Sequence, residues 1–500
     1  MFCLAKVSNY FEAPKGSGKS TIFTSNLWLG GVDNQGNLYV AAQKFCQKGF
    51  DFRLGPQTND YILKDTVIAG VTTTVKTYSD AYIQKYYHTW SVTPAEIEYH
   101  KNHYADPGYV MPWAIANWPA HGRTQFGESA NLAPFVDADG NGVYSPITGD
   151  YPKIRGDQTV FFIINDADKH TESGSIKSIG VDILGMAYAF NSSDAALQNT
   201  LFLSYELRNK GSNTLYDFYF GFWTDFDIGY ANDDYVGCDT TMNIMYGYNG
   251  TEIDGNGEAW AYGENPPAQG AMFLNQKMSA FVYHNNDQSG VGDPIYAIHY
   301  YNFLRALWMD NSPMTYGGNG YGGTERTRFM FSGDPVTNTG WTELTPNGPG
   351  STPNTPGDRR GLMSAGPFTF PAGGKLTVDI ALPFARTDGG KSAVSSLTLL
   401  KQYAPALQEY FNANILGIQE NKSNETTLLL YPNPSNGQFT IASEKIIESV
   451  DLYDLLGKKL FSDTPNVQTA QLSTHLPQGF YIYRVILQDK TVTSGKIVVQ

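Results

Sequence analysis

The sequence predicts a mainly β protein with a multi-domain body rich in antiparallel β-sandwiches, a few short helices, and a small separate β domain at the C-terminus. Aromatic residues make up 14% of the 500 residues, while charged residues make up 16%, below the roughly 25% of an average soluble chain. The 51 glycines and 26 prolines imply many turns. Short β-branched or aromatic runs between those turns are typical of strands.

The first predicted region, 1–155, begins with short strands. Apolar runs at 21–29, 38–42 and 61–63 alternate with Gly, Asp and Asn turns. Thr93 and Glu96 form a capping box around Pro94, which predicts a helix over 94–103.

The second predicted region, 156–415, has longer strands and ends in a helix. Strands are predicted at 160–164, 179–189, 200–208, 215–223, 271–274, 278–284 and 376–384. Apolar residues at helical spacing predict a helix over 392–412, which Pro405 should kink or split near Ala404.

A polar, unpatterned segment at 416–427 is predicted to be a linker to a separate domain at 428–500. This last segment holds six Lys and Arg residues and six Asp and Glu residues, so the net charge of −14 lies in the body. Such an acidic balance disfavours binding to nucleic acid. The sequence has no apolar run of the ~18 residues that a membrane helix needs, so no transmembrane segment is expected.

The N-terminal sequence has none of the features of a signal peptide. The C-terminal domain described next implies export, so we expect the chain to begin at an internal Met of a longer precursor.

Four motifs follow one another in the C-terminal domain. They are a YPNPSNG turn (Pro432, Asn433, Pro434, Gly437), a VDLYDLLGK strand and turn (Gly457), an LPQGFYIYR strand (Gly479, Tyr481), and the closing GKIVV (Gly495, Lys496, Val498). The segments are typical of hairpins in a small Ig-like β-sandwich. A generic sandwich explains the strands but not this ordered set.

In order and spacing, the four motifs resemble the type A C-terminal sorting domain of the type IX secretion system of Bacteroidetes. The resemblance implies that the secretion machinery exports the chain and that a sortase-like peptidase removes the domain near the linker. The resemblance further implies that the product is either released or joined covalently to lipopolysaccharide at the cell surface, outside the outer membrane.

The body resembles a family of long secreted Bacteroidetes proteins that bear the same tail. Segments 13–31, 118–122, 137–157 and 225–239 carry this resemblance. In that family the first of these segments lies inside the chain, which agrees with a missing N-terminal part. Because this family has no established activity, the resemblance implies none for the body.

The segment DADGNGVY at 137–144 predicts a calcium loop. Asp137, Asp139 and Asn141 offer oxygen ligands at alternate positions, and the Val143 carbonyl would add a neutral ligand. The glutamate that an EF-hand places at position twelve is absent, and Asp150 could replace it. The alternative is a loop of Asx turns that needs no metal; we favour calcium.

A second acidic cluster places five carboxylates within fifteen residues: Asp225, Asp227, Asp233, Asp234 and Asp239. Like charges at this density repel unless a cation or hydrogen-bond donors neutralise them. A further metal site and a solvated acidic turn explain the cluster equally well.

The segment APKGSGKS at 13–20 fits a loose phosphate-loop pattern. A working phosphate loop needs a helix after it, whereas the β-branched residues that follow predict a strand. We therefore expect no nucleotide binding.

Two functions fit these observations. The first is a non-catalytic adhesin-like or structural β-protein with calcium-stabilised loops, without catalytic residues. The alternative is a secreted glycosidase-like hydrolase that uses two of the carboxylates as acid and base. A carboxyl pair about 5–10 Å apart in an aromatic cleft would favour the enzyme, and convergence on one ion would favour the binding protein.

Overall fold

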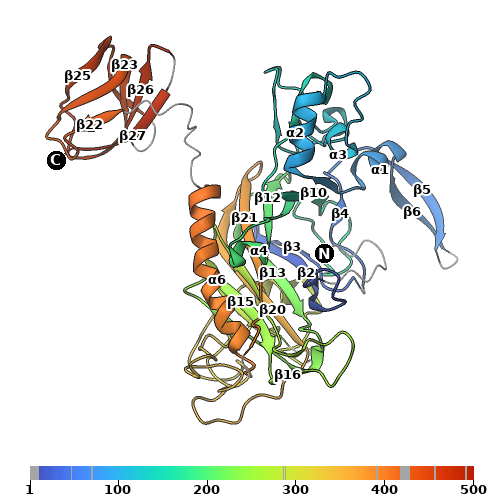
Figure 1. The fold of residues 1–500 in the computed structure, drawn as a ribbon. Coiled ribbons are helices and arrows are strands. Elements are labelled where there is room, and N and C mark those ends of the chain that lie inside the picture. Colours follow the sequence, from blue (N-terminus) through green and yellow to red (C-terminus); the bar gives the residue numbers. More distant parts are fainter. Residues whose placement is uncertain are drawn as a thin grey trace. The chain divides into compact units, whose positions relative to one another are not determined.

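The computed structural model describes residues 11–46, 48–68, 71–284, 287, 289–389, 392–416, 428–454, 458–489 and 492–499. Within these ranges the protein is mainly β, with several antiparallel sheets and few helices, as predicted. The chain divides into two compact units, Met1–Leu416 and Gly417–Gln500, and each is described by itself (Figure 1).

The larger sheet of the body has nine antiparallel strands in the order β14-β15-β18-β21-β12-β11-β10-β4, with β7 also paired to β10. Their bounds are β4 (Arg53–Leu54), β7 (Trp90–Val92), β10 (Gln158–Asn165), β11 (Val181–Ala189), β12 (Thr200–Asn209), β14 (Asp234–Asp239), β15 (Ile244–Asn249), β18 (Ala268–Phe273) and β21 (Lys375–Ala385). Strands from both sides of the predicted boundary at 155/156 thus share one sheet.

The second sheet has six strands in the order β1-β2-β13-β20-β19, with β3 paired to β2. Their bounds are β1 (Phe11–Glu12), β2 (Ser20–Val32), β3 (Leu38–Ala42), β13 (Leu215–Phe226), β19 (Met278–Tyr283) and β20 (Arg359–Phe370). Every pairing is antiparallel.

The nine-stranded sheet is buried on both faces, because its strands alternate between two cores. In β10, Phe162 and Ile164 belong to the core shared with the six-stranded sheet, while Phe161 and Ile163 belong to the core shared with the helices. Each large side chain buried in this way contributes about 1.5–3 kcal/mol to folding.

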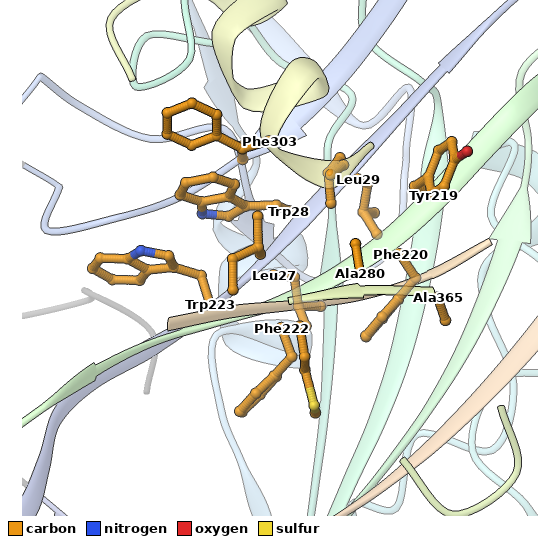
Figure 2. Close-up of a cluster of buried hydrophobic side chains, with 14 of the residues drawn as sticks. Leu27, Trp28, Leu29, Tyr219, Phe220, Phe222, Trp223, Ala280, Phe303 and Ala365 are labelled. Atoms are coloured by element: carbon orange, nitrogen blue, oxygen red, sulfur yellow. The ribbon is translucent and has the colours of Figure 1, made fainter. Parts of the chain in front are cut away.

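Aromatic rings fill the first core. Trp28 of β2 stacks on Trp223 of β13, with ring centroids 6.0 Å apart, and it meets Tyr300 edge-on at 4.7 Å. Figure 2 shows Trp28 between Phe303 and Trp223, with Leu27 beside the indoles and Phe222 below them. Helix α5 (Ala297–Leu304), which the sequence analysis did not predict, carries Tyr300 and Phe303.

The two predicted helices are present. Helix α2 (Pro94–His103) begins at the expected capping box of Thr93 and Glu96. Helix α6 (Ser395–Phe411) runs through Pro405 without the predicted split. Pro405 lies on the exposed side, and the buried residues Leu400, Leu407 and Phe411 keep the helix on the nine-stranded sheet.

The remaining helices are short: α1 (Asp80–Tyr86), α3 (Trp113–Ala116), α4 (Ala195–Gln198), the 3-10 turns η1 (Thr124–Phe126), η2 (Pro146–Thr148) and η3 (Ala231–Asp233), and the π-helical turn η4 (Asn412–Leu416). Three small ribbons complete the body: β5 (Tyr61–Ile68) with β6 (Val71–Tyr78), β8 (Phe135–Val136) with β9 (Tyr151–Pro152), and β16 (Ile253–Asp254) with β17 (Gly263–Glu264). No helix among the described residues has the length and apolarity to cross a membrane.

The second unit is a small β domain with its own core. Its strands are β22 (Leu429–Tyr431), β23 (Gln438–Tyr453), β24 (Lys459–Asp463), β25 (Val467–Ser473), β26 (Gly479–Leu487) and β27 (Val492–Val499). The first half of β23 pairs with β22 and β25, and its second half pairs with β24 and β26. The fully buried residues Ile441, Val450, Leu452, Val485 and Ile497 fill its interior.

Candidate functional site

The predicted calcium loop is closed by the ribbon of β8 and β9. Val136 pairs with Tyr151, so the next residues inward, Asp137 and Asp150, lie at the mouth of the loop. Asp137, Asp139 and Asp150 each offer a carboxylate oxygen, and these oxygens lie within 4.8 Å of one another. The structure thus brings together the three acidic residues that the sequence analysis proposed as ligands.

Backbone N–H groups hold Asp137 in place. Gly140 donates to its Oδ1 at 2.8 Å, and Gly142 donates to its Oδ2 at 2.7 Å. These bonds, that from Gly142 above all, keep the pKa of Asp137 below its usual value. The two glycines have φ of 73° and 77°, a conformation that other residues rarely adopt.

Asp150 is fully buried. Its carboxylate accepts hydrogen bonds from Ala138 N–H at 2.7 Å and Ser145 N–H at 2.8 Å. Its carbonyl oxygen lies 3.0 Å from Nε2 of His100 on helix α2. Because a carbonyl oxygen only accepts, His100 donates here and ties the loop to the helix, a contact that the sequence analysis did not anticipate.

The other two proposed ligands take part in the turns of the loop. The Asn141 amide nitrogen donates to Oδ2 of Asp139 at 2.8 Å, and Asn141 Oδ1 accepts from Val143 N–H at 2.7 Å. The Val143 side chain is exposed. These bonds order the loop without using all the oxygen lone pairs.

The second acidic cluster divides in the structure. Asp225 and Asp227, at the end of β13, meet Asp358, which precedes β20, with carboxylate oxygens within 4.8 Å of one another. The sequence analysis missed Asp358 because it lies more than a hundred residues away. Burial raises the pKa of Asp225 well above its usual value and that of Asp227 to about 7.

The other three acidic residues of this cluster lie elsewhere. Asp233 accepts from Gly255 N–H at 2.9 Å, and buried Asp234 accepts from Ile228 N–H at 2.9 Å. Asp239 lies at the far end of β14, where its carboxylate is 3.6 Å from Lys401. Backbone N–H groups and Lys401 therefore contact these carboxylates, while Oδ1 of Asp233 and Oδ1 of Asp234 are buried without a hydrogen bond from any described residue.

A cleft of about 880 Å³ opens beside Asp227. Its lining includes Glu12, Tyr230, Asn232 and Trp260. The Trp260 side chain is 55% exposed. Aromatic and polar side chains thus line the same cleft as one member of the second carboxylate group.

The phosphate-loop segment forms the turn between β1 and β2. Ser20–Val32 is a strand, as predicted, so the segment opens no helix. Lys19 Nζ donates to the Ala261 carbonyl oxygen at 2.6 Å. The lysine that would reach a phosphate is therefore held by the body itself.

In the second unit, the proposed sorting motifs contact one another. Asn433 lies between Pro432 and Pro434 in the sequence. Its side chain forms hydrogen bonds with the backbone of Lys496 and Val498. Thr474 N–H donates to the Gly437 carbonyl oxygen at 2.8 Å. The YPNPSNG turn is thereby fastened to the last strand.

The other motif residues that the structure describes lie on β26 and β27. Gly479 pairs with Val499, and Tyr481, whose hydroxyl donates to the Pro477 carbonyl oxygen, pairs with Ile497. A Cβ at Gly495 would lie 2.4 Å from the Tyr483 hydroxyl, so the glycine leaves room for this ring. Lys496 places its ammonium 4.1 Å from the Phe480 ring centre. Gly457 lies outside the described residues.

The second unit is therefore a compact β domain in which the described motif segments contact one another. Residues 429–500 match the family described as the secretion system C-terminal sorting domain. The chain thus carries a type IX secretion C-terminal sorting domain, is handled by the type IX secretion machinery, and is a secreted or cell-surface protein.

No curated protein sequence matches the chain. CopC from Methylosinus trichosporium OB3b is 18% identical over 14% of this chain and 88% of its own, with a TM-score of 0.11. A polysaccharide lyase is 10% identical over 73% of this chain and 38% of its own, with a TM-score of 0.20. PorZ, a surface component of the type IX secretion system of Porphyromonas gingivalis, is 10% identical over 70% of this chain and 45% of its own, with a TM-score of 0.14. Similarities this low assign no activity to the chain.

Proposed function

We propose that the chain is a non-catalytic surface or secreted β-protein, adhesin-like or structural, whose loop 137–150 binds calcium. The convergence of Asp137, Asp139 and Asp150 within 4.8 Å carries this proposal. Three like charges at this distance repel one another, and a bound cation would remove the repulsion. Calcium suits carboxylate, amide and carbonyl oxygens in a flexible loop.

The loop also meets a second requirement of a calcium site, because its ligands are held before the ion arrives. Asp137 accepts from three backbone N–H groups and Asp150 from two, and a carboxylate has further lone pairs for a metal. Extracellular sites of this kind typically bind at roughly 10⁻⁴–10⁻³ M. Calcium at ten times the dissociation constant would stabilise the body by about 1.4 kcal/mol.

Thermal melting in calcium and in excess chelator tests the site. We expect calcium to raise the melting temperature of the body, and Asp137→Ala or Asp139→Ala to abolish this rise. Asp106→Ala is the matched control, because Asp106 is an exposed aspartate whose partner is His103; this variant should keep the rise. An unchanged melting curve on chelation would show that the loop needs no calcium.

The sorting domain supports a finer proposal about the fate of the chain. We propose that a sortase-like peptidase cuts near segment 416–427 and that the body is released or joined covalently to lipopolysaccharide outside the outer membrane. In a host with the type IX machinery, deletion of residues 495–500 should trap the protein in the periplasm. Normal surface display of that deletion variant would contradict the proposal.

The hydrolase alternative depends on different geometry. Glycosidases use a pair of carboxyl groups about 5–10 Å apart, whereas here three residues, Asp225, Asp227 and Asp358, each offer an oxygen within 4.8 Å of the other two. Three oxygens that can share one ion favour an ion-binding site over an acid–base pair. A panel of polysaccharides incubated with the full chain should therefore yield no reducing ends.

A further inference from the structure

We propose that Asp225, Asp227 and Asp358 form a second divalent-cation site, which takes calcium independently of loop 137–150. The site lies where the end of β13 meets the beginning of β20. It stands on three observations: the convergence of the carboxylates, a buried oxygen without a hydrogen bond, and the balance of charge around it.

Strand pairing produces the convergence. Asp225 and Asp227 are two positions apart, so their side chains leave the extended chain on the same side. Asp225 pairs across the sheet with Arg360, and Phe226 pairs with Arg359. Asp358 directly precedes this pair and completes a group whose oxygens lie within 4.8 Å of one another.

Asp225 supplies the second, independent observation. Its side chain is 5% exposed, and its Oδ1 is buried and accepts no hydrogen bond from any described residue. The nearest cation is Nε of Arg360, at 3.4 Å, beyond ordinary hydrogen-bond length. A buried carboxylate oxygen in this state is costly unless something coordinates it, and a metal ion in the carboxylate group would do so.

The balance of charge points to a divalent ion. When all three carboxylates are ionised, the state that a bound cation favours, they carry −3, and Arg360, whose terminal nitrogen lies 2.9 Å from Asp358, contributes +1. The remainder of −2 equals the charge that calcium would neutralise. Asp293, the other carboxylate that acts on Asp225, pairs with His284 and Lys44 instead.

The site is open to solvent on one side. Asp227 lines the cleft of about 880 Å³, whereas Asp225 does not. An ion in the cleft can therefore contact the Asp227 carboxylate directly. Water or another oxygen ligand can complete its coordination there, as calcium sites of six to eight ligands require.

Equilibrium dialysis of the full chain against calcium at pH 8 tests the proposal. We expect the wild type to bind two ions, because loop 137–150 and this site each take one. Asp225→Asn, which keeps the shape of the side chain, should weaken the second site by more than about tenfold and leave one ion bound. Asp358→Asn is a second variant with the same expected result, should Asp225→Asn fail to fold.

Two further variants separate this proposal from the calcium loop. Asp137→Asn should remove the loop ion and leave the ion at Asp225. Asp239→Asn is the matched control, because Asp239 belongs to the same acidic stretch but lies at the far end of β14; it should leave two ions bound. If both Asp225→Asn and Asp358→Asn bind as many ions as the wild type, the second site is wrong, whatever Asp137→Asn shows.

Discussion

Asn433 and Val498 are joined across 65 residues of sequence: the Val498 N–H donates to Asn433 Oδ1 at 2.9 Å. The amide nitrogen of the same side chain donates to the Lys496 carbonyl oxygen at 2.8 Å. The Asn433 side chain therefore forms the hydrogen bonds to β27 that the backbone of a neighbouring strand would form. This explains physically why the YPNPSNG and GKIVV motifs occur together in one domain.

Replacement of Asn433 should loosen the end of the sorting domain. Asn433→Ala removes both bonds and should lower the free energy of unfolding of the domain by about 1–2 kcal/mol. Asn433→Asp can still accept from Val498 but cannot donate to Lys496, so its effect should be smaller. Urea denaturation of segment 427–500 measures both variants, and equal stability of Asn433→Ala and the wild type would contradict the assigned role.

That experiment rests on a prediction about segment 427–500 itself. Its core is formed by residues of the segment alone, among them Ile441, Val450 and Ile497, so we expect it to fold in isolation. Circular dichroism should show an all-β spectrum with a cooperative melt. A disordered spectrum would show that the domain needs the body.

Asp150 should matter for stability even without calcium. Asp150→Ala leaves the N–H groups of Ala138 and Ser145 without their acceptor, which should lower the stability of the body by about 1–3 kcal/mol. Asp139→Ala should show its effect chiefly when calcium is present. Melting of both variants in chelator separates the two roles; equal melting temperatures there would contradict the role of Asp150.

His170 predicts a loss of stability at alkaline pH. Its Nδ1 lies 2.6 Å from the Val40 carbonyl oxygen and its Nε2 lies 2.8 Å from that of Asp166. Carbonyl oxygens only accept, so both ring nitrogens donate and the ring is cationic. Burial alone lowers the pKa of His170, but the hydrogen bond and charge of Asp166, with the charge of Asp51, outweigh it and raise the pKa to about 9.

Because the pKa of His170 is raised in the folded state, the protein should become less stable as the pH rises. The stabilisation is fully present below the unfolded-state pKa of about 6.5 and is lost as the pH rises through about 9. The loss should be about 3 kcal/mol, since each tenfold change in proton affinity is worth about 1.4 kcal/mol. Urea unfolding from pH 6.5 to 9.5 measures it. His170→Gln should flatten the decline, and an equal decline in this variant would assign it to other groups.

Lys19 should have no part in nucleotide binding. Its ammonium is bonded to the Ala261 carbonyl oxygen and lies over the Tyr262 ring, 5.6 Å from the ring centre. Calorimetry at millimolar ATP should therefore show no binding to the wild type or to Lys19→Ala. The variant should instead lose about 1 kcal/mol of stability. Binding that Lys19→Ala abolishes would restore the phosphate-loop interpretation.

Local sequence determined those features that neighbouring residues decide among themselves. The capping box of Thr93 and Glu96 fixed the start of α2, and the β-branched run after Lys19 fixed β2. The motifs of the C-terminal domain identified it, because each motif is a contiguous turn or strand. In the same way, the spacing of Asp137 and Asp139 already described most of the first carboxylate group.

Strands β14, β15 and β20 were not predicted. Gly361, Gly366 and Pro367 interrupt β20, and two aspartates lie in β14, so strand propensity is weak in both. These segments are strands because their side chains are buried in the packed body, not because of their local propensity. Likewise, packing of α6 on the nine-stranded sheet carried the helix through Pro405, which sequence rules alone would have made a break.

The second carboxylate group shows most clearly what only the tertiary structure decided. The sequence places Asp225 in one stretch with Asp233, Asp234 and Asp239, yet Asp225 belongs to the six-stranded sheet while Asp239 lies at the last position of β14 in the nine-stranded sheet. The pairing of β13 with β20 brings Asp358 to Asp225 instead. Proximity along a chain sets charge density, whereas strand register sets which charges meet, and register depends on the hydrophobic faces that the whole body buries.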